Sequence, residues 1–356
     1  MKIHHFGSSF AVVALALCSI EQAAQAQCKA DLIVDGVVDG ADLAALLTAW
    51  GTTSDPLGCD INGDSLVDGS DLGFVLSGWG SCPPPTQLWA TVLQWNPNQA
   101  VVTDVTMRNA IIASGLPWRV RDTSSNIEML LVPAGTFTMG CSASNSYACS
   151  SAENPTHQVT LTQAFYMGKT EVTQAQWTAK MGSNPSSFVG YSDSPSRPVE
   201  RVSWNMTAST GGFNSVTGLR LPTEAEWEYA YRAGTTTAFH SYPAQPTGFN
   251  DDTLLGNIAW YNANAGSQTH AVGGRLANAL GLHDMSGNVW EWCQDWYGTY
   301  ASASVTNPTG PTTGSSRLLR GGGWTSGSYS CRASQRRGNS PGYADYAVGF
   351  RVARTP

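Results

Sequence analysis

The sequence predicts a loop-rich fold of short strands and a few helices around an aromatic core, preceded by a small helical module. Composition supports the larger part of this prediction, because the 356 residues include 37 Gly, 18 Pro and 13 Trp. Glycine and proline favour turns, while tryptophan brings large apolar area to a core. Charged residues make up 13% of the chain, against roughly 25% in ordinary soluble domains. A tandem repeat near the N-terminus predicts the small module, and the length allows two domains or more.

Residues 1–26 have the features of a secretory signal peptide. A basic start at Lys2, an apolar run over residues 10–17 and the small-residue site Ala24-Gln25-Ala26 follow in order. The run is too short to span a bilayer, and no later stretch approaches ~20 apolar residues. We therefore expect cleavage after Ala26 and a secreted, periplasmic or extracellular protein with no membrane span.

Net charge and cysteine count constrain the partners and the redox state. The formal charge of −7 argues against nucleic acid or an anionic membrane surface as a partner. Loss of Cys18 with the signal peptide leaves seven of the eight cysteines. In an oxidising compartment an odd number leaves at least one thiol unpaired, unless it bonds another chain.

Residues 27–82 contain an internal repeat, in which segment 31–42 aligns with segment 60–71. The second copy has oxygen-bearing side chains at positions 1, 3, 5, 9 and 12 of a calcium-binding loop and a carbonyl donor at position 7: Asp60, Asn62, Asp64, Asp68, Asp71 and Leu66. The first copy has Ile33 at position 3 but keeps four acids, Asp31, Asp35, Asp39 and Asp42. We therefore expect one tighter and one weaker calcium site. The alternative is an acidic turn between helices.

Each loop precedes a set of apolar residues at helical spacing: Leu43, Leu46, Leu47 and Trp50, then Leu72, Val75, Leu76 and Trp79. Paired loops with Asp at position 12 resemble dockerin modules. The resemblance implies a small all-α, EF-hand-like module and a cohesin-like or cell-surface partner bound through residues 27–82. Cys82-Pro83-Pro84-Pro85 is a stiff spacer that marks the clearest domain boundary. In the connector, residues 83–128, we expect a short helix near 110–112 and a strand at 118–121.

From Met129 onward the sequence predicts short elements separated by loops. Two short strands are expected across residues 129–140, followed by a strand from Gln158. Cys141 and Cys149 bracket a polar loop and could close on each other. Two capping boxes open helices that glycines end: Thr173–Gln176 with Gly182, and Thr223–Glu226 with Gly234.

Three separated motifs resemble the formylglycine-generating enzyme family, the sulfatase-modifying factors. They are segment 220–230, segment 281–297 with its Gly287-Asn288-Val289-Trp290-Glu291 run, and the turn at segment 320–324. The resemblance starts near Met129, and we assign residues 129–356 to this domain. It implies an irregular, loop-rich α+β fold similar to C-type lectins. It also implies an oxidase that converts a protein cysteine or serine to formylglycine with dioxygen.

The central motif also predicts a cation site. Its oxygen-rich run, with tryptophans beside it, suits a hard cation. The resemblance implies calcium, held by the side chains of Asp284 and Glu291 and by the carbonyls of Gly287 and Val289. It further implies the start of a second calcium site at Asn257 and Ile258. The alternative is that the two acids pair with arginines in an ordinary loop.

Oxidases of this family bind copper through two cysteines that follow the glycine turn, and the matching positions are Ser326 and Cys331. One thiolate is therefore missing, and serine is a poor Cu(I) ligand because its hydroxyl is hard and normally protonated. Copper is doubtful as a cofactor for this reason. Trp290 and Arg337 match family residues near the active groove. Cys331 has an alternative role in a structural disulfide with Cys293.

Two functions therefore remain open. In the first, the protein is an oxidase with Cys331 as its main redox residue. In the second, it is a non-catalytic, calcium-stabilised, lectin-like protein that binds a polypeptide or a glycan, which the serine at position 326 favours. Other chemistries fit less well. The G-x-S-x-G match at residues 338–342 lacks the strand and helix of a nucleophile elbow, and no histidine has a second ligand at zinc spacing.

Overall fold

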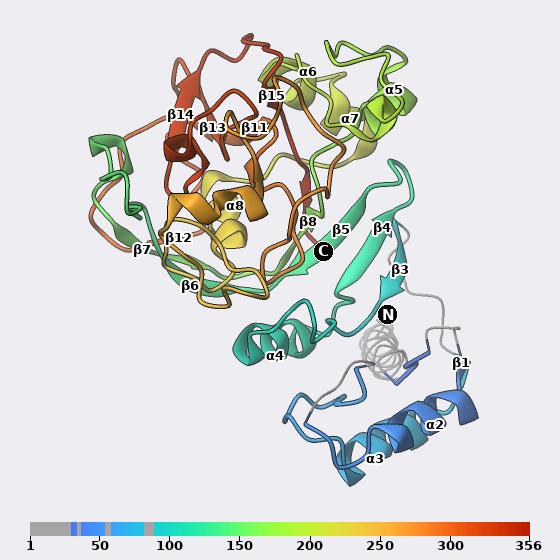
Figure 1. Ribbon diagram of the computed structural model, residues 1–356. Helices are drawn as coiled ribbons and strands as arrows, with labels where there is room; N and C mark the ends of the chain where they lie inside the picture. Colours follow the sequence, from blue (N-terminus) through green and yellow to red (C-terminus); the bar gives the residue numbers. More distant parts are fainter. Residues whose placement is uncertain (1–29, 34–36, 54–57, 82–88) are drawn as a thin grey trace, which may run out of the picture.

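The computed structural model describes residues 30–33, 37–53, 58–81 and 89–356. In Figure 1 the helices α2 and α3 lie below the large domain, at the blue end of the chain. The expected signal peptide, Asp35 and the proline spacer lie outside the described residues. No helix in the described part of the chain is long and apolar enough to cross a bilayer.

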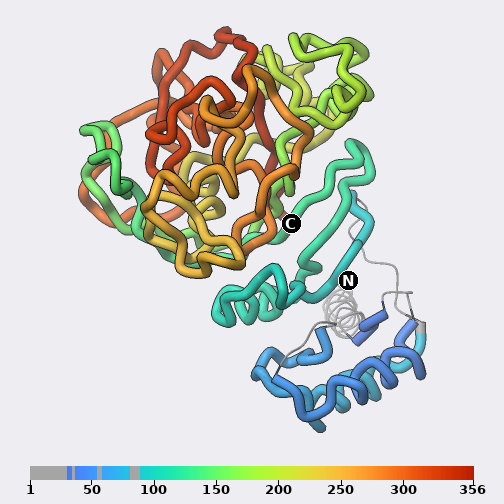
Figure 2. Tube along the Cα trace, in the orientation of Figure 1, coloured from blue at the N-terminus to red at the C-terminus, as the bar shows by residue number. Residues whose placement is uncertain are grey.

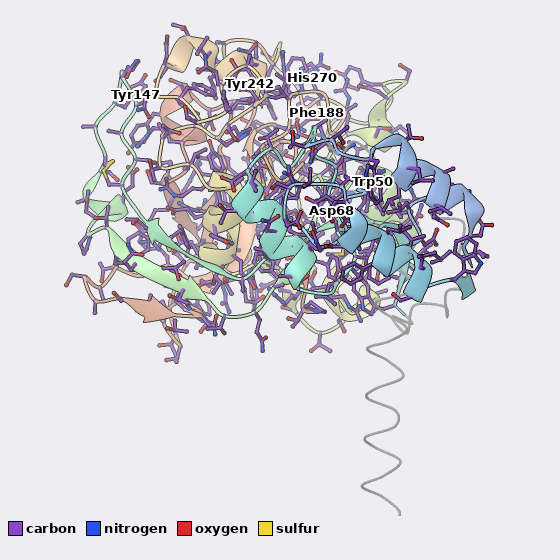
Figure 3. The ribbon with its side chains drawn as sticks, turned by 90° about the horizontal axis from the view of Figure 1, so that it is seen from below. Trp50, Asp68, Tyr147, Phe188, Tyr242 and His270 are labelled. Carbon is purple, nitrogen blue, oxygen red and sulfur yellow. A yellow bond between two sulfur atoms is a disulfide. The ribbon has the colours of Figure 1, made fainter. Side chains whose placement is uncertain are left out.

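The N-terminal module contains two copies of one capping loop. Before α2 (Gly40–Thr48) and α3 (Gly69–Ser77), an aspartate side chain accepts an N–H of the first turn, and an aspartate three residues later reaches back to it. The pairs are Asp39 with Asp42 and Asp68 with Asp71, and Asp68 lies at the start of α3 (Figure 3). These matching geometries confirm the repeat. The module is not all-α as expected, because β1 (Val37–Val38) and β2 (Gly80–Ser81) pair antiparallel where the chain enters and leaves it.

Only part of each predicted apolar set is buried in this module. Leu46 and Val75 lie in its core, and Leu43 and Leu72 pack against that core. The remaining members are exposed in both copies: Leu47, Trp50, Leu76 and Trp79. The repeat therefore leaves matching apolar side chains on its surface.

The largest sheet of the large domain is antiparallel, with strand order β16-β8-β5-β4-β3. Its strands are β3 (Ala90–Gln94), β4 (Arg119–Asp122), β5 (Glu128–Val132), β8 (Phe165–Gly168) and β16 (Ala353–Arg354). The strand expected at 118–121 is β4, and the helix expected near 110–112 is α4 (Val105–Ala113). The connector thus supplies two strands to the sheet that also holds the C-terminal strand.

Two further sheets position the candidate site. The four-stranded sheet has the order β14-β13-β11-β15, and the three-stranded sheet has the order β12-β7-β6. Their strands are β6 (Gly135–Met139), β7 (His157–Leu161), β11 (Trp290–Trp296), β12 (Val305–Thr306), β13 (Arg317–Arg320), β14 (Arg336–Asn339) and β15 (Val348–Gly349). A parallel pair joins β9 (Ala259–Trp260) to β10 (Ser286–Gly287). Long loops connect these strands in the trace of Figure 2.

The helices of the large domain are short. They are α5 (Gln174–Met181), α6 (Trp204–Ala208), α7 (Phe213–Thr217) and α8 (Glu224–Arg232), with 3₁₀ turns η1 (Ser151–Glu153), η2 (Ser194–Ser196), η3 (Asp252–Asn257) and η4 (Ser328–Cys331). Both predicted capping boxes form, and Gly182 ends α5 with φ of 74°. Ala233, rather than Gly234, takes the left-handed position after α8. The mixed, loop-rich α+β architecture confirms the predicted character of the domain.

The core is aromatic, as expected, but it also contains charged side chains. Trp177, Trp227 and Trp292 are fully buried, and so are Arg320, Arg332 and Arg351. Each buried arginine contacts a glutamate: Arg320 with Glu228, Arg332 with Glu153, and Arg351 with Glu291. A buried guanidinium needs such a partner because desolvation of an unpaired charge is costly.

The fold decides three predictions: two about which cysteines form disulfides and one about the G-x-S-x-G segment. Cys141 and Cys149 form the expected disulfide. Cys293 and Cys331 are both free, so the alternative that they pair with each other is wrong. A strand, β14, does lead into the 338–342 segment, contrary to expectation, but a turn rather than a helix follows it. The segment is therefore still no nucleophile elbow.

Candidate functional site

The two positions matched to the copper cysteines lie in two consecutive turns. Gly323 donates its N–H to the Ser326 hydroxyl at 3.0 Å, and the N–H of Ser326 donates to the Gly323 carbonyl at 2.8 Å. The turn η4 then carries the chain to Cys331. The Ser326 hydroxyl is thus already used as an acceptor inside its own turn.

The Cys331 thiol points into an apolar cluster. The residue is fully buried with Phe239, Leu255 and Ile258, among others. A Cβ placed on Gly322 would come within 2.9 Å of its sulfur, so the glycine turn packs directly against the thiol. Burial raises the pKa of Cys331 to about 12. The side chain is therefore a neutral thiol at physiological pH, and a neutral thiol is neither a good nucleophile nor a good metal ligand.

Trp290 and Arg337 come together beside the same turn. Trp290 is buried at the start of β11, and the exposed Arg337 lies on β14 with its guanidinium 5.8 Å from a Trp290 ring centre. A Cβ on Gly323 would lie 3.4 Å from the Trp290 ring. Trp290 and Arg337 are thus neighbours, and Gly323 connects Trp290 to the Ser326 turn, while the Cys331 thiol is buried in the apolar cluster.

An aromatic ledge, defined as Phe188, Trp324 and Tyr346, extends from this turn. Trp324 packs edge-on against Phe188 at 5.3 Å between ring centroids and lies 5.4 Å from Tyr346. Its indole N–H donates to the Tyr346 carbonyl at 3.0 Å. Tyr346 is exposed, as is Val189 next to Phe188. The ledge therefore offers outward-facing apolar area held in a fixed arrangement.

Glu291, one of the expected calcium ligands, is paired inside the domain. Arg351 donates to both of its carboxylate oxygens, at 2.6 and 2.5 Å, and the Trp227 indole N–H donates at 2.6 Å. The arginine pairing that the sequence left open is thus present at Glu291. It is not present at Asp284, which accepts only the Gly273 N–H through Oδ2, while its buried Oδ1 has no hydrogen-bond partner among the described residues.

A further carboxylate, Glu171, lies beside Asp284. It accepts the side-chain N–H of Asn288 at 2.7 Å and the Val289 N–H at 3.0 Å. Burial and the nearby carboxylates of Asp284 and Glu291 hold the pKa of Glu171 well above its ordinary range. Three buried carboxylates therefore gather around the single guanidinium of Arg351, which leaves an excess of potential negative charge.

The other expected calcium positions are placed less favourably. The Asn257 carbonyl accepts the Leu276 N–H, and its side chain donates to the Tyr242 hydroxyl. Ile258 is buried in the cluster around Cys331. Gly287 has φ of 81° and packs so closely on Trp260 that a Cβ there would lie 2.2 Å from the Trp260 carbonyl oxygen.

Comparison with known proteins identifies the domain. The sequence model of the sulfatase-modifying factor enzyme 1-like domain matches residues 118–356. The chain belongs to this family. Chaperone protein LppX of Paenibacillus barcinonensis is 32% identical over 258 residues, which cover 58% of this chain and 81% of LppX. The formylglycine-generating enzyme of Streptomyces coelicolor is 36% identical over 169 residues, which cover 45% of this chain and only 53% of that enzyme.

Solved structures similar to this sulfatase-modifying-factor domain share its fold. Treponema denticola variable protein 1 aligns with a TM-score of 0.55 at 33% identity, covering 65% of this chain and 95% of that one. PvdO from Pseudomonas aeruginosa aligns with a TM-score of 0.53 at 26% identity, covering 67% and 98%. The family match begins at residue 118, inside the segment treated as connector by sequence.

The candidate calcium loop of the second copy is held by hydrogen bonds from its own N–H groups to its acidic side chains. Asp60 accepts the N–H groups of Gly63 and Ser65, both at 2.8 Å, and Asp71 accepts those of Ile61 and Asp68. Asn62 and Asp64 bond to each other, and Asp64 also accepts the Leu66 N–H. Burial and the neighbouring Asp71 and Asp64 raise the pKa of Asp60.

In the first copy the matching loop is less complete. Ile33 has no side-chain oxygen to offer a cation, and its N–H donates to Asp42. Asp31, at position 1 of this loop, is buried.

Sequence reasoning missed Glu171 and Arg351 as members of this family site. Glu171 lies two residues before Thr173, which caps α5, and next to the buried Val172. An acid beside an apolar residue in this segment was a usable signal in the sequence. Nothing local in the sequence indicates that Arg351 pairs with a residue 60 positions earlier.

Proposed function

We propose that this chain is a non-catalytic member of the sulfatase-modifying factor family that binds a polypeptide on the aromatic ledge and the adjoining Trp290–Arg337 surface. The observation that carries the proposal is the state of Cys331. It is the one thiol at the two positions matched to copper, and it is buried, neutral and directed into apolar side chains.

These residues do not fit a two-thiolate copper site. Cu(I) prefers soft thiolates held close together. The Ser326 hydroxyl is hard, and it is occupied by the Gly323 N–H. The oxidase activity in the names of some relatives is therefore not transferred to this chain, which also spans only about half of the Streptomyces coelicolor enzyme.

A polypeptide is favoured as ligand by two features. The relative LppX is named a chaperone, and this chain spans 81% of its length. The ledge offers exposed aromatic area beside the exposed guanidinium of Arg337, and aromatic and arginine side chains dominate the energetics of polypeptide interfaces. A glycan is the alternative ligand.

The wild-type protein is expected to bind an unfolded polypeptide without oxidising it. Reduced, carboxymethylated α-lactalbumin serves as the probe in a fluorescence titration. Trp324→Ala and Tyr346→Ala should each weaken binding by about tenfold, because an interface aromatic is typically worth 1–2 kcal/mol or more. Tyr147→Ala, which removes an exposed tyrosine from the loop closed by the Cys141–Cys149 disulfide, is the matched control and should change nothing. Binding to a glycan array instead of the probe would overturn the choice of ligand.

An oxidation assay on the same wild-type protein tests whether it is catalytic. With Cu(I) and a sulfatase-type cysteine peptide supplied, we expect no aldehyde mass shift from wild type, nor from Ser326→Cys, since the second thiol stays buried. Robust turnover by wild type would contradict a non-catalytic role and require a different ligand set.

We further propose that calcium stabilises the large domain. Asp284 supplies an unpaired buried oxygen, and Glu171 adds a second carboxylate. The family resemblance implies the carbonyls of Gly287 and Val289 as further ligands. Glu171 accepts only from neutral N–H groups, whereas the charge of Glu291 is already neutralised by Arg351, so Glu291 fits this role less well. An ion here would connect the loop at residue 171 to the central motif and balance the excess negative charge.

Chelation is expected to lower the melting temperature of the full chain. Calcium at about 100 times its dissociation constant adds about 2.7 kcal/mol, which corresponds to a shift of roughly 5–10 °C for a domain of this size. Asp284→Asn should abolish most of the response to EGTA. Asp60→Ala is the control, because it removes the position-1 ligand of the tighter N-terminal loop and should leave the large domain's response intact. An equal response in wild type and Asp284→Asn would exclude a structural ion at this position.

The N-terminal module completes the proposal. We propose that the protein is exported through the signal peptide expected at residues 1–26, and that the module binds calcium and a cohesin-like or cell-surface partner. The exposed Leu47, Trp50, Leu76 and Trp79 support a protein partner, since both copies present the same apolar residues. Loss of cell-surface retention in a Trp50→Ala/Trp79→Ala variant would be the supporting result, and unchanged retention the contrary one.

A further inference from the structure

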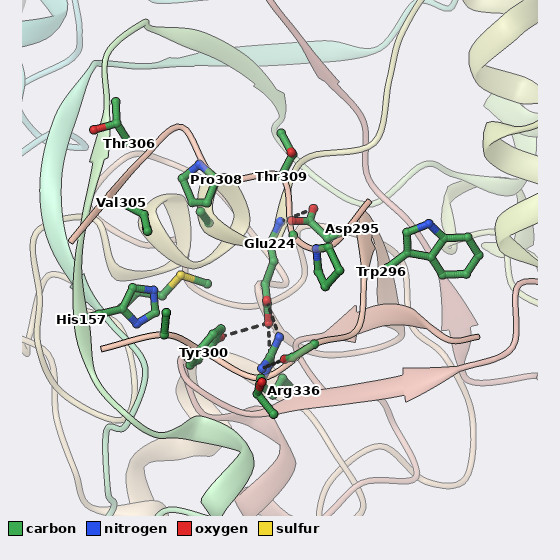
Figure 4. Close-up of a pocket in the computed structure, with 17 residues that line it drawn as sticks. His157, Glu224, Asp295, Trp296, Tyr300, Val305, Thr306, Pro308, Thr309 and Arg336 are labelled. Carbon is green, nitrogen blue, oxygen red and sulfur yellow. Dashed lines mark hydrogen bonds and ion pairs between the residues drawn. The ribbon is translucent and has the colours of Figure 1, made fainter. Parts of the chain in front are cut away.

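A cavity of about 490 Å³ lies far along β11 from the Ser326 turn, between the start of α8 and the loop that follows β11 (Figure 4). Asp295 and Trp296 at the end of β11 form one side, and His157 of β7 and Tyr300 form another. None of the residues that the sequence assigned to catalysis or calcium binding lines it. The proposed function makes no use of this cavity.

Of the carboxyl groups that line this cavity, Asp295 is the one with a hydrogen-bond donor at only one of its two oxygens. It is 4% exposed, and its Oδ2 accepts the Glu224 N–H at 2.9 Å. Its Oδ1 has no hydrogen-bond donor among the described residues. Gly310, with φ of 71°, passes so close that a Cβ there would lie 3.1 Å from this oxygen. The protein does not seal this oxygen off, so a donor that enters the cavity can reach it.

The cavity's own cation does not supply that donor. Arg336 gives its guanidinium to both oxygens of Glu224, at 2.8 and 2.6 Å, and to the Gly298 carbonyl at 2.7 Å. The Tyr300 hydroxyl also donates to Glu224, at 3.1 Å. Glu224 and Arg336 therefore neutralise each other, and an ionised Asp295 would face the cavity with no hydrogen-bonded cation among the described residues, only the more distant charges of Arg336 and Arg317.

The remaining walls are largely aromatic and apolar. Tyr300 packs against the His157 ring at 4.8 Å between centroids, and the arginine lies over the other side of the same phenol. Methylene and methyl groups come from Met139, Val305, Pro308 and Pro311. The Trp296 ring points away from these walls and stacks on Trp204 and Arg317 (Figure 4). Such walls suit an alkyl stem and the face of a cation, whereas a sugar would place several hydroxyl groups against carbon.

We propose that this cavity binds a primary ammonium group carried on an alkyl stem, with Asp295 as its counter-ion. Both a lysine side chain and a small free amine have this chemistry. The ammonium donates to the unpaired Asp295 oxygen, and the stem packs against the proline and valine walls. The inference does not depend on polypeptide binding at the aromatic ledge. The ledge lies beside the Ser326 turn and shares no residue with this cavity.

Protonation of Asp295 gives the interaction a characteristic pH dependence. Burial, and then the nearby Glu224, raise the pKa of Asp295 to about 7. An alkylammonium stays charged throughout this range, with a pKa near 10. Affinity should therefore rise about tenfold per pH unit below pH 7 and level off above it, because only the carboxylate form pairs with the ligand. The charged or titratable groups around it are Glu224 and Glu226 of α8, Arg336 of β14, Arg317 of β13, Cys293 of β11, and His157 and Tyr300 of the cavity wall.

The test uses the full chain and isothermal titration with n-butylamine between pH 5.5 and 8.5. At pH 8 we expect n-butylamine to bind at least about tenfold more tightly than n-butanol, its neutral counterpart of the same size. Equal affinities, no binding, or an affinity that does not change with pH would each overturn the proposal, and these measurements need only wild type.

Variants and a second ligand locate the site and its source. Asp295→Asn should remove the preference for the amine over the alcohol, while Asp193→Asn, at an exposed aspartate paired with Arg197, should retain it. A preference that survives in Asp295→Asn contradicts the assignment. Nα-acetyl-lysine N-methylamide separates the two sources. Tighter binding than n-butylamine identifies a lysine side chain of a polypeptide, and binding of n-butylamine alone identifies a free amine.

Discussion

Replacing Glu228 by glutamine is expected to lower the free energy of unfolding by about 3–5 kcal/mol. Glu228 lies on α8 with no exposed surface and is held by two arginines at once. Arg232, one turn later, donates to Oε1 at 2.9 and 2.7 Å, and Arg320 of β13 donates to Oε2. The Gly140 N–H donates as well, at 2.9 Å. The substitution removes the full negative charge that both buried guanidinium groups share, leaving Arg320 only the more distant Glu224 at 3.8 Å, and neither guanidinium can regain its hydration.

Glu128→Gln is the matched control for this prediction. Glu128 also has two cationic partners, Arg119 at 2.7 Å and Lys169 at 3.0 Å, but the two cations are about a third exposed. Solvent screens such a pair, so the same substitution should cost about 1 kcal/mol or less. Urea unfolding followed by tryptophan fluorescence measures both. Similar small losses in the two variants would show that the buried arginines are stabilised by something other than Glu228.

The features predicted correctly from sequence are those that a local pattern specifies. A capping box needs two residues three positions apart, and both Thr173 and Thr223 form theirs. The Cys141–Cys149 disulfide closes a short loop. The repeated helices of the N-terminal module also follow from local spacing, because Asp39 and Asp68 cap them in the same way. In each case the interacting groups are near neighbours in the chain.

The features that were missed depend on residues far apart in sequence. Glu153 pairs with Arg332 across 179 residues, and Glu291 pairs with Arg351 across 60. No periodicity marks such partners, since each side chain alone reads as an exposed charge. The far side of the main sheet was hidden for the same reason: β3, β4 and β5 pair in chain order, but β8 and then β16 complete the sheet from distant segments.

The candidate site shows the same division between local and distant information. Counting along the chain gives Ser326 and Cys331 as the positions matched to the copper cysteines, and the two lie in consecutive turns. It does not show that Cys331 faces inward, because that depends on Phe239 and Leu255, which arrive from other segments to cover the thiol. The identity of a residue at a family position is therefore less informative about chemistry than its burial.

Asp295→Asn is expected to stabilise the protein by about 4 kcal/mol above pH 7. Burial, with Glu224 nearby, raises the pKa of Asp295 from its ordinary 3.8 to about 7. The folded protein therefore holds this proton over a range in which the unfolded chain has released it. Stability is lost as the pH rises from about 4 to about 7, and the loss is complete once the folded carboxyl ionises. The asparagine carbonyl can still accept the Glu224 N–H, and it carries no charge to desolvate.

The variant and wild type should accordingly separate as the pH is raised. At pH 5 the difference in unfolding free energy should be about 1–2 kcal/mol, and at pH 8 about 4 kcal/mol. Asp193→Asn provides the control, because its aspartate is 41% exposed at the side chain and should give a difference that changes little with pH. Curves for Asp295→Asn and wild type that run parallel from pH 5 to pH 8 would contradict a buried, weakly compensated carboxyl. Saturating n-butylamine should narrow the gap at pH 8, since an ammonium beside Asp295 supplies to the wild type the positive charge that the fold itself withholds.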